Sequence, residues 1–164
     1  MKYKNQQSIG LSIFASIILA QAAHAASFTW DGNENSNWDT TSENWTTPAV
    51  FWPAVAGDND AVFAGAAPGV IAVDAAGVSV NDITFSATGY NISGPGVLTL
   101  SETTNIITAT AAATISANLA GTNGFTNAGV QNLALSGNNS GLTGTITLNN
   151  ITATNNAEIG RAHV

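Results

Sequence analysis

Hydrophobic side chains alternate with polar ones in short runs along this chain, most clearly from residue 70 onward. A period of two is the pattern of a β-strand with one buried face. Glycine, asparagine and serine separate the runs, as turn residues do. The pattern predicts strands at residues 70–73, 78–85 (with a slip in the alternation near Asn81 and Asp82), 90–92, 97–100, 106–108, 114–116, 133–135 and 145–148.

The spacing of these strands favours an architecture made of β-structure alone. Beyond Ala25 no segment has the helical period of an amphipathic helix. Short strands spaced roughly 8–12 residues apart are typical of sandwiches, barrels and solenoids. The stretch 96–101 (GVLTLS) returns at 129–136 (GVQNLALS) with two residues inserted, and repeats of this size indicate stacked rungs. We therefore predict an all-β, right-handed parallel β-helix, or β-solenoid, with a β-sandwich as the alternative.

Residues 28–63 differ from the rest because they hold every tryptophan of the chain: Trp30, Trp38, Trp45 and Trp52. A solenoid must cover the apolar core at its open end. We interpret residues 26–67 as an aromatic-rich N-terminal cap, followed by solenoid repeats over residues 68–157. The same core is expected to include Phe28, Phe51 and Phe63. The alternative is that the four tryptophans bind glycans, because exposed rings can stack on sugars.

The segment from Met1 to Ala25 has the features of an export signal. Lys2 and Lys4 precede an apolar run over residues 9–20, and Ala23-His24-Ala25 fits a small-x-small cleavage site. Residues 1–25 therefore predict a secretory signal peptide. The apolar run is too short to span a bilayer, which takes about 20 residues.

The C-terminal heptapeptide, residues 158–164, is interpreted as foreign to the protein. Codons for this heptapeptide resemble a sequencing adapter, so we expect it to be read-through rather than native sequence. Of the ten acidic and three basic residues, the signal peptide holds Lys2 and Lys4, and the heptapeptide holds Glu158 and Arg161. Nine carboxylates then remain without a lysine or arginine, a charge that repels nucleic acid. With no cysteine in the chain, stability depends on packing and hydrogen bonds.

Few side chains of this composition can perform catalysis. A serine nucleophile needs a base such as histidine or lysine, and residues 26–157 contain neither. Two carboxylates can hydrolyse a glycoside. Nothing in the spacing, however, fixes a working pair among Asp31, Glu34, Asp39, Glu43, Asp58 and Asp60. We predict a protein that is not an enzyme and has no cofactor.

Oxygen-bearing side chains alternate at the start of the tryptophan-rich region, in Asp31, Asn33, Asn35 and Asp39. Calcium prefers oxygen ligands held in a loop. These four residues, together with Asp58 and Asp60, are candidate calcium ligands. A polar strand face is the alternative for the first group. A turn before residues 61–63 is the alternative for the second, because Asp and Asn bond their own backbone in turns.

Several motifs, taken in order, resemble one protein family. The segment 133–146 (LALSGNNSGLTGTI) is similar to the autotransporter-associated β-strand repeat of large secreted or surface proteins in Gram-negative bacteria. Residues 30–63, with WDG, two NW pairs and GDNDAVF, resemble the start of such proteins, as do residues 80–94, with VNDITF and YNISG. Residues 102–105 (ETTN) depart from the repeat, since its Gly-Asn is lost there.

The resemblance implies a passenger segment, which is a parallel β-helix exported through the inner membrane and carried at the cell surface, at the outer membrane or outside the cell. It implies a structural or adhesive role, with surface glycans and host or neighbouring cell surfaces as partners. It also implies an outer-membrane translocation barrel in a part of the protein beyond this chain. No catalytic residues come with it. The alternative is a secreted carbohydrate-binding or carbohydrate-active protein whose catalytic part lies elsewhere.

Overall fold

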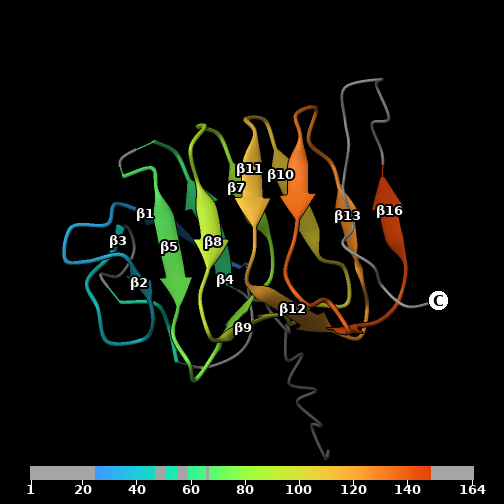
Figure 1. The fold of residues 1–164 in the computed structure, drawn as a ribbon, viewed down its shortest axis with the longest axis horizontal. Helices are drawn as coiled ribbons and strands as arrows, with labels where there is room; N and C mark the ends of the chain where they lie inside the picture. The colour runs from blue at the N-terminus through green and yellow to red at the C-terminus, as the bar shows by residue number, and fades with distance from the viewer. Residues whose placement is uncertain (1–24, 47–50, 55–58, 66, 149–164) are drawn as a thin grey trace, which may run out of the picture.

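The computed structural model describes residues 25–46, 51–54, 59–65 and 67–148, which form sixteen strands in three sheets (Figure 1). Sheet A contains β1 (Ala26–Trp30), β3 (Trp45–Thr46), β4 (Asn59–Phe63), β7 (Ile83–Phe85), β10 (Ile106–Ala109), β13 (Phe125–Asn127) and β16 (Ile146–Leu148). Sheet B contains β2 (Asn37–Trp38), β5 (Val70–Val73), β8 (Asn91–Ser93), β11 (Ala113–Ile115) and β14 (Leu133–Leu135). Sheet C contains β6 (Val78–Val80), β9 (Val97–Leu100), β12 (Asn118–Gly121) and β15 (Gly141–Leu142). Within these ranges no helix is long and apolar enough to cross a membrane.

From β4 onward the chain visits sheets A, B and C in turn and then returns to sheet A, so each circuit is one rung. Successive rungs pair in parallel on all three sheets, and β1 with β3 is the antiparallel exception among the described strands. Ile107 lies level with Ile83 of the preceding rung, and Leu135 lies level with Ile115 in the same way. The predicted all-β solenoid is confirmed. The alternative is wrong, because the sheets of a β-sandwich are antiparallel.

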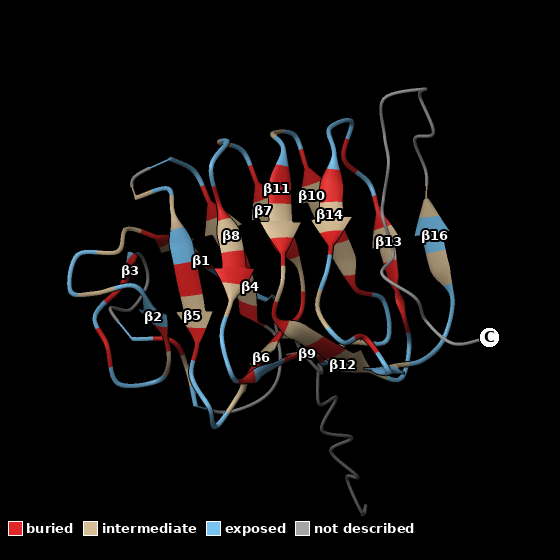
Figure 2. Cartoon of the chain, viewed as in Figure 1, coloured by how far each residue is buried: buried red, intermediate tan, exposed pale blue. Residues whose placement is uncertain are grey.

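Buried and less buried residues alternate along strands such as β4, β7 and β11 (Figure 2), so every second side chain of these strands points to the axis. Ile71, Ile92, Ile115 and Leu135 stand level on consecutive strands of sheet B, and each is at most 1% exposed. Each such side chain contributes about 1.5–3 kcal/mol when it leaves water. The core is therefore a set of apolar ladders that run along the solenoid axis.

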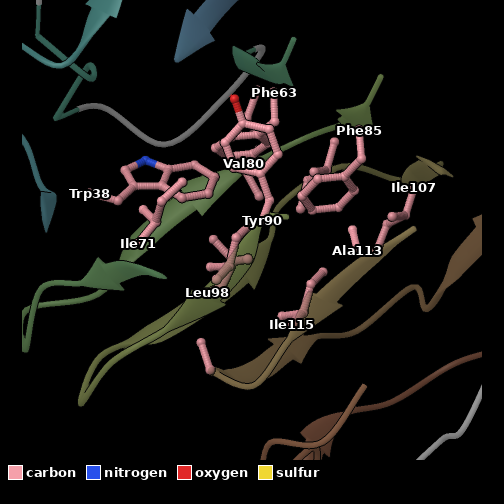
Figure 3. Packing of buried hydrophobic residues seen from close by; sticks show 14 of the residues in the cluster. Trp38, Phe63, Ile71, Val80, Phe85, Tyr90, Leu98, Ile107, Ala113 and Ile115 are labelled. Carbon is pink, nitrogen blue, oxygen red and sulfur yellow. The ribbon is translucent and has the colours of Figure 1, made fainter. Parts of the chain in front are cut away.

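The axis is aromatic at the N-terminal end and mainly aliphatic further along (Figure 3), where Phe125 is the buried ring. Phe63 of β4 stacks on Phe85 of β7 with ring centroids 5.1 Å apart and planes 17° from parallel. Ala109 of β10 continues the same ladder beyond Phe85. Tyr90 packs 5.2 Å from Phe63, and its hydroxyl oxygen accepts a hydrogen bond from the Gly65 N–H (2.9 Å).

Glycine and asparagine build the corners between sheets. At Gly96 a Cβ atom would lie 1.7 Å from the Asp74 carbonyl oxygen of the rung before, so no larger residue fits without moving backbone. At another corner Asn105 is buried, and its Nδ2 donates to the carbonyls of Glu102 and Gly124, each at 3.0 Å. Its Oδ1 accepts from the Glu102 N–H. This side chain thus bonds its own corner and the next rung.

Two details of the predicted strand pattern are wrong. Residues 78–85 form two strands, because the chain turns from sheet C to sheet A at Asn81 and Asp82. The two copies of the sequence repeat are not equivalent in space, since β9 lies on sheet C and β14 on sheet B. Beyond residue 70, three more strands have no predicted counterpart: β12, β13 and β15.

Candidate functional site at the aromatic end

Aromatic rings fill the end of the solenoid formed by β1 to β4. Ring centroids lie 4.7 Å apart for Trp45 and Trp52 and 5.1 Å apart for Trp30 and Trp45. Pairs at such separations attract one another beyond the effect of burial. Phe28 joins through Trp52 at 5.4 Å, and Trp38 lies 5.7 Å from Phe63. The aromatic cluster predicted at the N-terminal end is therefore present.

The loop around this cluster is organised by Asn44, whose side chain is fully buried. Its Oδ1 accepts the backbone N–H groups of Glu34 (3.1 Å) and Asn35 (3.0 Å). Its Nδ2 donates to Asn35 Oδ1 and to the Asn37 carbonyl, both at 2.8 Å. A buried amide that forms four hydrogen bonds fixes the conformation of a loop whose backbone is not paired in a sheet. Asn44 holds Trp38 and Trp45 in place by fixing the chain between them.

Burial of the indoles bears on the prediction that the tryptophans bind glycans. Stacking on a sugar needs a ring face open to solvent, and Trp30, Trp38, Trp45 and Trp52 are each at most 1% exposed. Trp52 Nε1 donates to the Ser79 carbonyl at 3.1 Å. The other three indole N–H groups are buried without a partner among the described residues. A glycan could reach these rings only if the cluster opened.

Phe51 does not join the core, contrary to expectation. It is 41% exposed, whereas Phe28 and Phe63 are buried. Phe51 directly precedes Trp52, which is 1% exposed. Trp52 takes the inward position, which leaves the Phe51 ring at the surface. Composition alone could not decide between the two rings.

The candidate calcium ligands are engaged in local hydrogen bonds. Asp31 accepts the Asn33 N–H at 3.1 Å and the Asn33 Nδ2 at 2.8 Å. Asn35 Oδ1 accepts the Asn37 N–H at 2.7 Å. In the described part of the chain no three acidic, histidine or cysteine side chains gather as a metal-binding group would. The structure thus places these residues in loop turns, and calcium binding by them stays a prediction.

The other two described candidates, Asp39 and Asp60, also accept hydrogen bonds. Asp39 accepts hydrogen bonds from the backbone N–H groups of Thr41 (2.8 Å) and Ser42 (2.6 Å). Asp60 Oδ1 accepts the Asp82 N–H of the next rung at 3.3 Å. Asp58 lies outside the described residues.

Two carboxylates have shifted pKa values. At Asp39 partial burial raises the pKa, but the hydrogen bonds from Thr41 and Ser42 outweigh it and leave the pKa below its ordinary value. At Asp82 burial raises the pKa, and the Ile106 N–H, which donates to Oδ1 at 2.7 Å, opposes this only in part. Residues 25–148 contain no histidine or lysine that could serve as the base for a serine nucleophile.

A comparison with curated proteins finds a relative in the adhesin BmaC autotransporter of Brucella suis biovar 1 (strain 1330). It is 34% identical to this chain over 137 residues, a stretch that covers 76% of the chain. The chain is homologous to an autotransporter adhesin. The resemblance seen in the sequence motifs is thereby confirmed. The chain corresponds to 4% of the relative's length. No family model matches the chain, and no solved structure matches it significantly.

The outward face of the solenoid carries polar side chains that stand level from rung to rung. Thr84 and Thr108 stand level on sheet A, and Asn91 and Thr114 stand level on sheet B, all with side chains pointing away from the axis. Residues 103–148 carry no charged side chain. The later rungs therefore offer hydroxyl, amide and methyl groups in repeated rows.

Proposed function

We propose that this chain is a non-enzymatic adhesive or structural passenger segment of an autotransporter-like protein. The observation that supports it best is the homology to an autotransporter adhesin over 76% of the chain, combined with a parallel solenoid. A solenoid of this kind holds many equivalent surface groups at fixed spacing. Adhesion then arises from the sum of weak contacts, because linked sites act at high effective concentration.

The remaining parts of the proposal concern location and partners. Residues 1–25 act as an export signal, and the protein is carried at the cell surface of a Gram-negative bacterium or outside it. A translocation barrel in the rest of the protein is its partner for export. Surface glycans and the surfaces of host or neighbouring cells are its partners in adhesion.

The adhesive role is tested with inert beads that carry the full chain covalently. We expect these beads to be retained on epithelial or bacterial cell layers in greater numbers than albumin-coated beads. A matched control carries Gly96→Val, because a side chain there collides with the backbone of the neighbouring rung while surface composition is unchanged. Retention equal to albumin, or equal for both forms of the chain, would contradict an adhesive solenoid.

Surface location is tested on intact cells of the source bacterium. Antibodies raised against residues 68–148 should label intact cells, and external proteinase K should remove that signal. A signal that is protected until the cells are lysed would contradict surface display.

A further inference from the structure

A groove lies on the outer side of the aromatic end. It is shallow and open to solvent, has a volume of about 540 Å³, and is lined by the exposed residues Asn33, Glu34, Thr41, Glu43 and Phe51. Of the aromatic residues in this region, Phe51 is the one with a large exposed fraction, 41%. The groove therefore combines an accessible aromatic ring with two glutamate side chains.

The free polar atoms of this groove are mainly acceptors. Glu34 Oε2 accepts the Glu43 N–H at 2.6 Å, which leaves Oε1 open to a ligand. The Glu43 carboxylate has no partner among the described residues. The hydroxyl of Thr41 donates instead to Asp39 Oδ1 at 3.2 Å. The Asn33 Nδ2 likewise donates to Asp31 Oδ2 at 2.8 Å.

The chain supplies no cation to these carboxylates. The described residues contain eight Asp and Glu side chains, and the sequence has no lysine or arginine between residues 5 and 160. Such a field concentrates positive charge at an acidic groove. An aromatic face adds attraction for a cation, most often an arginine guanidinium. Arginine also matches carboxylate oxygens with its planar fork of donors.

We propose that this groove binds an arginine side chain on an extended segment of a partner protein. The guanidinium stacks on Phe51 and donates to Glu34 and Glu43. A neutral sugar fits less well, since the Thr41 hydroxyl donates to Asp39 and one of the two Asn33 Nδ2 hydrogens donates to Asp31. This inference names a partner chemistry for the adhesive role proposed above and rests on that role only for its biological meaning. Binding itself is a property of the purified chain.

The test measures fluorescence anisotropy of a fluorescein-labelled Gly-Ser peptide with two arginines, titrated with the full chain. The matched probe has citrulline in place of arginine, which keeps the shape and removes the charge. We expect the arginine peptide to bind, the citrulline peptide to bind at least about tenfold more weakly, and 0.5 M NaCl to weaken the former.

Variants locate the site. Glu43→Gln should weaken arginine-peptide binding about threefold, and Glu34→Gln with Glu43→Gln about tenfold. Phe51→Leu keeps an apolar side chain and should weaken binding about threefold through loss of the ring. Glu102→Gln removes the same charge from a distant corner and should leave binding unchanged. Circular-dichroism melts of each variant show whether the fold is retained, and Glu43→Gln alone suffices if the double variant unfolds.

Three outcomes would overturn the proposal: equal binding of the citrulline peptide, equal weakening by Glu102→Gln, or displacement of the peptide by neutral oligosaccharides. The first outcome would mean that binding does not depend on the charge of the guanidinium. The second would mean that the overall negative charge of the chain, and not the groove, attracts the peptide. The third would indicate a glycan site. If beads fail to adhere while the arginine peptide still binds as described, the adhesive function is overturned and the groove stands.

Discussion

The aromatic end and the later rungs of this solenoid bury their cores in different ways. The end is built from large rings, short strands and loops held by side chains, and it holds five of the eight carboxylates of the described residues. In the rungs from β10 to β16 the buried hydrophobic side chains are aliphatic except for Phe125, and no side chain is charged. A rung is covered by the next rung, whereas an end must be covered by bulky side chains. One continuous core in this chain therefore uses two kinds of packing.

The largest expected difference between the two regions comes from core truncation. Trp38→Ala should cost about 3–5 kcal/mol of unfolding free energy, because the ring contacts Trp45, Trp52 and Phe63. Ile115→Ala in the rungs should cost less, about 2–3 kcal/mol. Urea unfolding of the full chain, followed by circular dichroism, measures both. A smaller loss of unfolding free energy for Trp38→Ala than for Ile115→Ala would contradict the larger contribution expected from the rings of the aromatic end.

Loss of the hydrogen bonds of Asn44 should give the next largest change in stability. Asn44→Ala removes a buried amide with four partners and should destabilise the end by about 2 kcal/mol. Hydrogen exchange should then accelerate at the amides of Glu34 and Asn35 while those of β11 and β14 stay protected. Uniform acceleration along the whole chain would mean that the two regions unfold as one unit.

Lowering the pH should have opposite effects on the contributions that Asp39 and Asp82 make to stability. The folded pKa of Asp39 is lowered, so its stabilising contribution is present above the unfolded value of about 3.9 and is lost as the pH falls through the folded pKa. The folded pKa of Asp82 is raised, so its contribution is present below about 3.9 and is lost as the pH rises through the folded pKa. Asp39→Asn should therefore reduce acid destabilisation, and Asp82→Asn should stabilise at neutral pH. Melting temperatures of both variants, measured from pH 2.5 to 7, test these predictions. A change of melting temperature in the same direction for both variants would contradict the opposite pKa shifts of Asp39 and Asp82.

Salt should produce the smallest difference. Raising NaCl from 20 to 500 mM shortens the Debye length from roughly 20 Å to about 4 Å and screens repulsion among the carboxylates of the aromatic end. Protection there should rise by a few tenths of a kcal/mol, in line with weak surface electrostatics. Amides in β10 to β16 should not respond. An equal response in both regions, read by hydrogen exchange, would show that salt acts through the hydrophobic effect instead.

The sequence predicted the class of fold better than its internal register. Alternation in segments such as 97–100 and 133–135 marks strands wherever one face is buried. The pattern Leu-x-Leu, however, occurs in β9 on sheet C and in β14 on sheet B. The two copies of the sequence repeat therefore match positions that do not stack on each other in the solenoid. Residues 125–127 form β13 because neighbouring strands offer backbone partners on both sides, although the segment has one apolar side chain.

The candidate site was less predictable. Trp52 and Phe51 are adjacent and alike in hydrophobicity, yet one is buried and the other is exposed. Asp31 and Asn33 alternate like metal ligands, but their oxygen and nitrogen atoms bond each other. Which ring is buried and which polar side chains bond each other depend on how the loops pack in the tertiary structure. The local sequence pattern does not determine that packing. Export, calcium binding and partners stay predictions.

Backbone hydrogen bonds between rungs lie along the solenoid axis, and this has a mechanical consequence. Tension applied between the ends of the axis loads these bonds one rung at a time, so the terminal rung should peel away before its neighbours. A released rung, such as the circuit from Ile83 to Ile107, lengthens the molecule by roughly 80 Å of extended chain. A surface protein built in this way would lengthen in steps under shear flow and would re-form rungs when the load falls.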